Sequence, residues 1–288
     1  MTASGAAASI GALRVGCARV SGVALLTCLA LAGCRSGAAP RVAAPPIRPA
    51  RPVTLQQALD SYDGYCDGIR TFSASGDLDI KDLRAGKQRK LGVRLVATRG
   101  DRLYLKGSVL VVTALEVVSD GQRFWFQVPS RKTVWTGLAS DDAPAAEGAD
   151  QAPYYALRPR DVTAALLPNP LAHGDGEAVL IEAEREAIWL SVARAEAGRG
   201  TVRRRVGLDR ESLRPVSLRA YDDRGELVSD VALGSWSADA PRRVVIRRPG
   251  EGYVADFTLE KVELNKAVPE KAFEPRLAEG YKTVEVGK

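Results

Sequence analysis

The sequence predicts a mainly β protein of the α+β class. The expected fold is an incomplete antiparallel β-barrel of about eleven strands, with an N-terminal helix and a short mid-chain helix as a lid. Three observations predict it. From residue 72 onward, many short runs alternate apolar and polar residues. Turn signals such as Asp120-Gly121 and Asp223-Arg224-Gly225 separate these runs. Two further segments place apolar residues at spacings of three and four.

The first 33 residues have the pattern of an export signal. Arg14 and Arg19 supply positive charge, and residues 1–33 contain no acidic residue. An apolar run from Val20 to Gly33 follows, with the length of a signal-peptide core and too short to span a bilayer comfortably. We therefore expect residues 1–33 to be removed on export.

A cysteine follows this apolar run directly. The stretch LAGC, which ends at Cys34, resembles the bacterial lipobox, whose cysteine is alkylated with diacylglycerol before cleavage. Cys17 lacks a preceding apolar run, and Cys28 follows a threonine, so Cys34 is the candidate for lipidation. An ordinary secretory signal with an accidental cysteine is the alternative. Two or three acyl chains, palmitate among them, form a stable membrane anchor. Because Arg35 rather than aspartate follows, the resemblance implies the outer membrane, facing the periplasm.

Composition sets limits on the exported chain. The signal holds two of the 41 basic residues and none of the 35 acidic ones, which leaves a formal charge of +4. That charge predicts no nucleic-acid partner, and it permits weak attraction to anionic lipids. Cys66 is the one remaining unmodified cysteine, so no intramolecular disulfide is expected. Residues 34–53 form a linker rich in Pro, Arg and Ala, acting either as a passive spacer or through arginine contacts to lipid phosphates.

Residues 54–288 are predicted to form a single domain that begins with a helix. Thr54 and Gln57 have the spacing of a capping box, in which each side chain satisfies a free backbone N–H. A stripe of apolar residues follows at helical spacing, with aspartates off the stripe. Its members are Leu55, Leu59, Tyr62, Cys66 and Ile69.

About five strands should follow this helix, then a short helix, then about six strands. The runs KLGVRLVA, DRLYLKG and QRFWFQVP represent the first group, and EAIWLSVA opens the second. The short helix is expected at residues 160–167, between prolines, with Asp161 as its possible cap. Strands that are apolar on one face form a sheet whose apolar side has to be covered.

Four segments in this order resemble the LolA/LolB family of lipoprotein carriers and receptors. The resemblance implies that the sheet curls, that helices cap its mouth, and that its apolar concave side holds acyl chains of a passenger lipoprotein or lipid. A soluble periplasmic carrier is a further implied partner. The segments are the amphipathic helix of residues 54–69, RGDRLYLKG with VVSDGQRFWFQVPSRKTVWTG in 99–137, DRESLRPVSLRAYDDRGELVSDVAL in 209–233, and VELNKAVPEKAFEP in 262–275.

The apolar face of such a half-barrel supplies the candidate lipid-binding residues. Inward aliphatic and aromatic side chains give non-directional burial, which suits a passenger recognised by its lipid. The candidates are Leu55, Leu59, Tyr62, Leu103, Leu105, Phe124, Phe126, Leu166, Ile188, Leu190, Phe257 and Leu259.

Three residues are candidates for lid control or transfer. Arg99 stands where the soluble carrier has an arginine that holds the lid helices by hydrogen bonds, although Gly100 replaces the carrier's proline. A solvated turn arginine is the alternative. The receptor has a projecting loop with an exposed leucine where this chain has KGSVLVV. Val109 or Leu110 is thus the candidate protruding residue. The alternative is that both are ordinary strand residues.

Catalytic chemistry is not expected, nor is a metal or other cofactor. His173 is the one histidine, and it lies in a polar loop, where a solvated role is expected. Carboxylates are plentiful, but no pattern selects a catalytic pair. We expect a monomer without enzyme activity. Three functional classes stay open: a lipoprotein receptor that assists insertion, a lipid-binding envelope sensor, and a structural envelope lipoprotein.

Replacing the candidate anchor tests the lipobox directly. Cys34→Ala should abolish labelling by a radioactive fatty acid and release the protein into the soluble envelope fraction, because no other cysteine combines the apolar run with the small residues. A variant that still takes up label and pellets with membranes would contradict the prediction.

Overall fold

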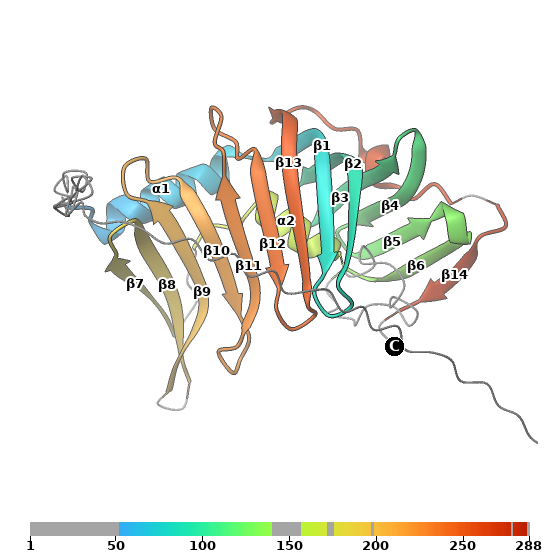
Figure 1. The fold of residues 1–288 in the computed structure, drawn as a ribbon. Coiled ribbons are helices and arrows are strands. Elements are labelled where there is room, and N and C mark those ends of the chain that lie inside the picture. Colours follow the sequence, from blue (N-terminus) through green and yellow to red (C-terminus); the bar gives the residue numbers. More distant parts are fainter. Residues whose placement is uncertain (1–51, 140–156, 172–175, 197–198, 278, 287–288) are drawn as a thin grey trace, which may run out of the picture. The chain divides into compact units, whose positions relative to one another are not determined.

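One sheet of fourteen strands organises the described part of the chain (Figure 1). The computed structural model describes residues 52–139, 157–171, 176–196, 199–277 and 279–286. The signal, Cys34, most of the linker and His173 lie outside these residues. Along the sheet the strand order is β14-β6-β5-β4-β3-β2-β1-β13-β12-β11-β10-β9-β8-β7. The first strand of the chain therefore pairs with β13 in mid-sheet, and two meanders run outward from that pair.

All neighbouring strands are antiparallel except β14 and β6, which are parallel. The strands before the second helix are β1 (Thr71–Asp82), β2 (Lys87–Thr98), β3 (Arg102–Val109), β4 (Val112–Asp120), β5 (Arg123–Val128) and β6 (Thr133–Leu138). Those after it are β7 (Glu177–Ala183), β8 (Ala187–Glu196), β9 (Arg199–Asp209), β10 (Pro215–Tyr221), β11 (Leu227–Gly234), β12 (Arg243–Arg248), β13 (Tyr253–Leu264) and β14 (Lys282–Glu285). Short 3₁₀ helices lie at η1 (Pro129–Arg131) and η4 (Glu270–Phe273).

The first helix, α1 (Leu55–Gly68), begins as the sequence predicts. The Gln57 backbone N–H donates to Thr54 Oγ1 at 3.2 Å, and the Thr54 N–H donates to Gln57 Oε1 at 3.1 Å, so the capping box is confirmed. The most buried face differs slightly from the expected stripe, because Ala58 is fully buried while Leu55 and Leu59 are only half-buried. The small alanine lets the helix lie close to the sheet.

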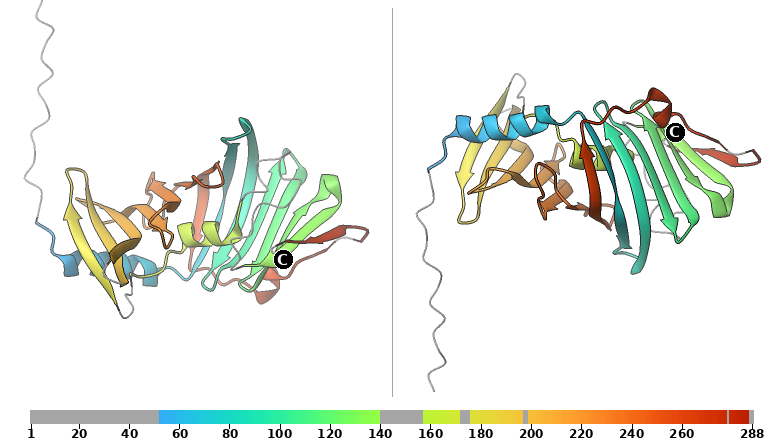
Figure 2. Two further views of the ribbon diagram at one scale, coloured as in Figure 1. Left: turned by 90° about the horizontal axis from the view of Figure 1, so that it is seen from below. Right: turned by 90° about the horizontal axis from the view of Figure 1, so that it is seen from above.

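The second helix, α2 (Pro159–Leu166), lies one residue earlier than expected. Arg158 occupies the cap position without a capping side chain, and Asp161 lies inside the first turn instead. Because β6 and β7 are separated by eleven strands of the sheet, the chain must cross the sheet between them. The described part of this connection, which contains α2, lies on the apolar face (Figure 2).

The apolar face of the sheet carries two clusters, and each is closed by one helix. The central core joins α2 to β1–β6 and β11–β13, and includes Leu95, Leu105, Val162, Leu166 and Phe257. The lateral core joins α1 to β8 and β9, and includes Ala58, Tyr62, Cys66, Ile188, Leu190 and Val206. One apolar row links them across the paired strands: Leu190, Val206, Leu218, Val231, Ile246, Ala255 and Ile80.

A glycine allows the central pair of strands to bend. The register between β1 and β13 shifts between Ser75 and Gly76. A Cβ atom at Gly76 would lie 2.1 Å from the Thr258 carbonyl oxygen, so no other residue fits without movement of the backbone. This bulge lies where the two meanders meet.

The fold class is confirmed: the described chain is mainly β, with one curled sheet left open and two helices. The sheet has more strands in its described part than the expected eleven, because β4, β7 and β14 lack clear alternation. Neither helix is long and apolar enough to cross a membrane, among the residues that the structure describes.

Candidate functional site

Arg99 connects the C-terminal ends of both helices. It lies in the turn between β2 and β3, and its guanidinium donates hydrogen bonds to backbone carbonyl oxygens on each side. On the α1 side, Nε donates to Ile69 at 3.1 Å and Nη2 donates to Cys66. On the α2 side, Nη1 donates to Leu167 at 3.1 Å and to Pro168 at 2.7 Å. One side chain on the sheet thus contacts both helices.

The chemistry of helix ends explains why an arginine fits there. The last carbonyl groups of a helix have no partner within the helix, and they carry the negative end of the helix dipole. A guanidinium has five N–H donors in a fixed plane, so it can serve several carbonyls at once. Bonds between a charged donor and a carbonyl contribute about 1.5–3 kcal/mol each.

Asn265 provides a second attachment for the end of α1. Its Nδ2 donates to the Gly68 carbonyl oxygen at 2.8 Å, and the Arg70 backbone N–H donates to its Oδ1 at 2.8 Å. Asn265 has φ of +57°, a left-handed conformation that asparagine tolerates well. It follows β13 directly, so the end of α1 is fixed to the middle of the sheet as well as to the β2–β3 turn.

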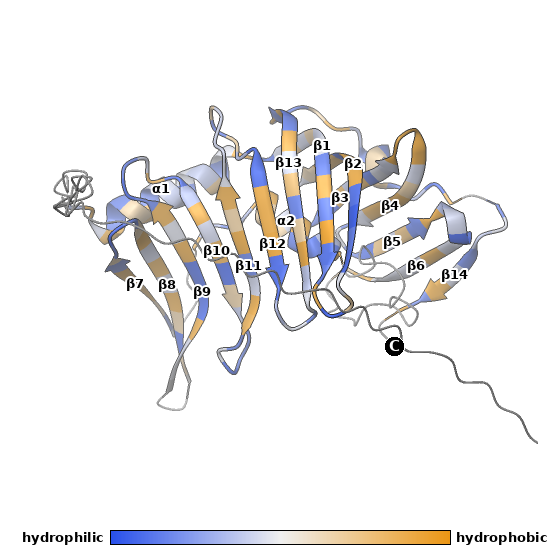
Figure 3. Ribbon diagram, viewed as in Figure 1, coloured by the Kyte–Doolittle hydropathy of each residue, from blue (hydrophilic) through white to orange (hydrophobic). Residues whose placement is uncertain are grey.

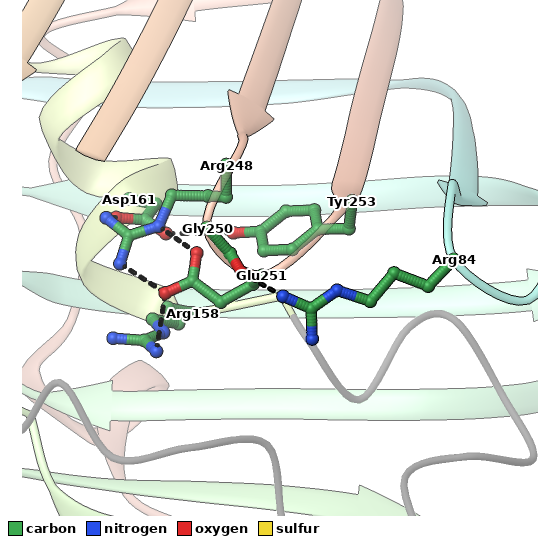
Figure 4. A network of polar contacts seen from close by, with 7 residues as sticks. All are labelled: Arg84, Arg158, Asp161, Arg248, Gly250, Glu251 and Tyr253. Carbon is green, nitrogen blue, oxygen red and sulfur yellow. Dashed lines mark hydrogen bonds and ion pairs between the residues drawn. The ribbon is translucent and has the colours of Figure 1, made fainter. Parts of the chain in front are cut away.

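A buried ionic network holds the other end of α2 (Figure 4). Arg248 at the end of β12 is only 4% exposed, and its Nη1 lies 3.2 Å from Asp161 Oδ1. The Tyr253 hydroxyl donates to Asp161 Oδ2 at 2.8 Å. Glu251 binds Arg248 Nε at 2.6 Å and also pairs with Arg158 at 2.9 Å. Buried ion pairs therefore connect the first turn of α2 to the β12–β13 turn.

Two opposing effects set the pKa values of the carboxyl groups in this network: burial raises them, and the neighbouring arginines and hydrogen bonds lower them. Burial raises the pKa of Asp161, and the charge of Arg248 and the Tyr253 hydrogen bond offset only part of that effect. For Glu251, burial also raises the pKa, but the hydrogen bond and charge of Arg248 and the charge of Arg158 outweigh it, so the net pKa is lowered.

The predicted lipid-binding residues fall into the two cores rather than one continuous surface. Leu103, Leu105, Phe126, Leu166, Phe257 and Leu259 belong to the central core, with Phe124 packed against it. Tyr62, Ile188 and Leu190 belong to the lateral core, with Leu55 and Leu59 packed against it. Most of these side chains are buried beneath the helices, so the structure describes a closed arrangement. Their role in lipid binding stays a prediction.

Two surface hollows lie away from these residues. One, of about 420 Å³, is lined by residues of β8–β10 and the β10–β11 turn, including Ser191, Arg205 and Tyr221. The other, of about 510 Å³, is lined by residues of β1, β2, β13 and their surroundings, including Ser75, Arg94 and Lys261. Neither hollow includes a predicted lipid-binding residue.

The hairpin between β3 and β4 ends in an exposed apolar tip (Figure 3). Leu110 is 94% exposed and Val111 is 96% exposed, while Val109 and Val112 are 51% and 67% exposed. The family resemblance indicates Val109 or Leu110 and does not indicate the two valines that follow. Exposing four consecutive apolar side chains to water is unfavourable in free energy. Such an exposed apolar patch indicates a surface that contacts a membrane or another molecule.

Cys66 is a buried free thiol on α1. Burial raises its pKa to about 12, against smaller opposing effects of a Tyr62 hydrogen bond and the Arg99 charge. The thiol is thus protonated at neutral pH and unreactive while the helix stays in place. No group of three His, Cys, Asp or Glu side chains in the described segments could hold a metal ion.

Comparisons with known proteins place the fold beside several solved structures. The chain is similar to a LolA superfamily protein. That protein, from Nitrosomonas europaea, is 12% identical, with 78% of this chain and 99% of that chain covered and a TM-score of 0.47. An outer membrane lipoprotein-sorting protein domain from Vibrio parahaemolyticus is 14% identical, with 76% and 96% covered and a TM-score of 0.47. A DUF1329 family protein from Desulfovibrio piger is 14% identical, with 76% and 96% covered and a TM-score of 0.49.

No protein-family model matches the sequence, and no curated protein matches it either.

Removing one partner of the buried network should destabilise the protein strongly. Arg248→Met leaves Asp161 and Glu251 without their main counter-charge, so urea unfolding should show a loss of about 3–5 kcal/mol. Arg243 on the same strand forms an exposed pair with Asp256 at 2.8 Å, and Arg243→Met should leave the unfolding midpoint nearly unchanged. Equal losses for the two variants would contradict the importance of the network.

Arg99 should control access to Cys66. In Arg99→Met both helix ends lose their hydrogen bonds to the β2–β3 turn, and the end of α1 keeps its attachment through Asn265, so local opening of α1 becomes cheaper and the thiol reacts faster. Since 1.4 kcal/mol corresponds to a factor of ten, loss of even one such bond should raise the rate of maleimide labelling about tenfold.

The control for this experiment is Arg102→Met, three residues along the chain. Arg102 pairs with Glu270 and stacks on Phe273, and both partners belong to η4 rather than to α1 or α2. If both variants leave the labelling rate of Cys66 at its original value, Arg99 does not restrain α1.

Proposed function

We propose that the protein is a lipid-anchored envelope lipoprotein that takes up acyl chains of lipoproteins or lipids beneath its two helices and assists their insertion at the outer membrane. Acylated Cys34 anchors it, and residues 34–53 hold the domain off the bilayer. It faces the periplasm and performs no covalent chemistry.

The observation that carries this proposal is the position of Arg99. A protein whose apolar face is merely filled by its own side chains has no need for one residue that holds the ends of two helices. A lid has such a need, because breaking the bonds of a single side chain loosens the C-terminal ends of both helices. The lateral and central cores then become accessible together.

Acyl-chain burial supplies enough free energy for such an opening. Each buried CH₂ contributes roughly 0.8 kcal/mol, so a chain of about sixteen carbons gains on the order of 12 kcal/mol on leaving water. The hydrogen bonds of Arg99, at about 1.5–3 kcal/mol each, and the displaced helix contacts oppose this gain. Binding and release can therefore be balanced, and transfer follows when the next site holds the chain better.

The tip of the β3–β4 hairpin supports the delivery step. Residues 109–112 are apolar and exposed, and the anchor keeps the domain near the bilayer. An apolar tip of this kind lowers its free energy by entering the acyl region of a membrane. In this proposal it brings the loaded domain to the surface where the passenger leaves.

A structural role without uptake is the second candidate. The observation in its favour is that Leu103, Leu105 and Leu190 are fully buried in the closed arrangement, so the protein core is already packed. A lipid sensor that acts on a partner protein would share the uptake step but not the insertion step.

Uptake and insertion can be measured separately. The mature chain from residue 34 with Cys34→Ala should bind a fluorescent acyl probe saturably, and an acylated peptide should displace the probe. Leu110→Asp together with Val111→Asp should leave this binding unchanged but slow transfer of the peptide to vesicles several-fold, because the tip no longer enters the bilayer.

Leu83, an exposed residue in the β1–β2 turn, provides the matched control, and Leu83→Asp should affect neither step. Absence of saturable binding would leave the structural role. Binding with transfer that is insensitive to the tip would favour the sensor.

A further inference from the structure

Two buried hydrogen-bond donors lie where the central and lateral cores meet. The Tyr65 hydroxyl on α1 and the Trp236 indole Nε1 after β11 are both buried, and neither has a hydrogen-bond partner among the described residues. The two rings contact each other edge to face, with centroids 5.6 Å apart and planes at 73°. An unpartnered buried donor is destabilising, so a neighbouring pair of them calls for an explanation.

The position of the pair connects it to both cores. Tyr65 packs against the central core and the lateral core, and Trp236 packs against the central core. Tyr65 lies on α1 and Trp236 follows β11, so their ring contact joins the helix to the sheet. Movement of α1 away from the sheet separates the two rings and ends the burial of both donors against each other's elements.

The chemistry of the pair points to a neutral acceptor. Burial raises the pKa of Tyr65, so its hydroxyl keeps its proton and remains a donor. Two cations lie nearby: Arg214 lies over the Trp236 ring with its Cζ 5.6 Å from the centroid and pairs with Asp239 at 3.7 Å, and the charge of Arg99 acts on Tyr65. Two neutral donors beside two apolar surfaces match a group with one acceptor oxygen at the end of a hydrocarbon chain.

We propose that Tyr65 and Trp236 form the subsite for the carbonyl end of the bound acyl chain, donating hydrogen bonds to the ester or amide oxygen that joins the chain to its parent molecule. The chain itself lies against the cores on either side. This inference rests on the proposed uptake of acyl chains, and it adds the residues that distinguish an acyl group from a plain hydrocarbon.

The test compares two ligands that differ only in the carbonyl group. A monoacylglycerol and the matching monoalkylglycerol ether compete with a fluorescent acyl probe for the mature chain carrying Cys34→Ala. The unchanged protein should bind the ester about tenfold more tightly, since two neutral hydrogen bonds to a buried acceptor are worth about that factor. Tyr65→Phe and Trp236→Phe should weaken ester binding and leave ether binding as it was, so that the preference disappears.

Two control variants remove the same groups from the other face of the sheet. Tyr104→Phe removes a hydroxyl whose partner is Glu116, and Trp189→Phe removes an indole N–H that is also buried and unpartnered among the described residues. Trp189 stacks between Arg205 and Arg219 rather than facing a helix. Both controls should keep the preference for the ester.

Stability in the absence of ligand gives an independent measurement. If the Tyr65 hydroxyl is held without a partner, Tyr65→Phe should leave the unfolding midpoint unchanged or raise it. A lowered midpoint would mean that the hydroxyl is already satisfied, and it would overturn the inference. Equal affinities of the unchanged protein for ester and ether, or a preference that survives both substitutions, would overturn it as well. Absence of any saturable probe binding would instead refute the uptake function itself.

Discussion

The hydrogen bonds from Arg99 to the ends of two helices hold these helices over the apolar face of the sheet. The sheet alone cannot bury that face, because its edges at β14 and β7 are not joined and its strands are apolar on one side only. Two short helices complete the burial, and both reach the same turn between β2 and β3. A single guanidinium in that turn replaces the water that the helix carbonyls would otherwise bind. The bonds of this side chain can break without disturbing the sheet, while Asn265 and the Arg248 network provide other attachments of the two helices.

Topology explains how α1 and α2 come to lie over the apolar face. The first and thirteenth strands pair in mid-sheet, so the chain passes from β13 over six strands to β14 at one edge and, earlier, from β6 beside that edge over eleven strands to β7 at the far edge. The connection from β6 to β7 carries α2. The helix before β1 has to end where β1 begins, in mid-sheet, and it extends from there over β8 and β9. Both helices consequently have their C-terminal ends near the centre of the sheet, within reach of Arg99 and Asn265.

The sequence predicted what depends on local periodicity and missed what depends on distant partners. The capping box of Thr54 and Gln57 and the alternating strands were readable because their signals lie within a few residues. In β7, consecutive Val179, Leu180 and Ile181 obscure the alternation, and β14 is only four residues long. The network around Arg248 joins residues up to 93 positions apart, which no local pattern reveals. Arg99 was singled out through family resemblance, since a turn arginine has no distinguishing spacing of its own.

Hydrogen bonds hold the C-terminal end of α2, and buried ion pairs hold its N-terminal end. This difference determines which end of a lid can open first. At its C-terminal end, opening exchanges hydrogen bonds to backbone carbonyls for hydrogen bonds to water, so the net cost is modest. At its N-terminal end, Arg248 is almost fully buried between Asp161 and Glu251, and separating these charges leaves them unpaired in a poorly hydrated site. The C-terminal end is thus the cheaper one to release. An α2 that pivots on the Arg248 network would expose the central core while staying attached to the β12–β13 turn, and restoring the Arg99 bonds would return it to one defined closed position.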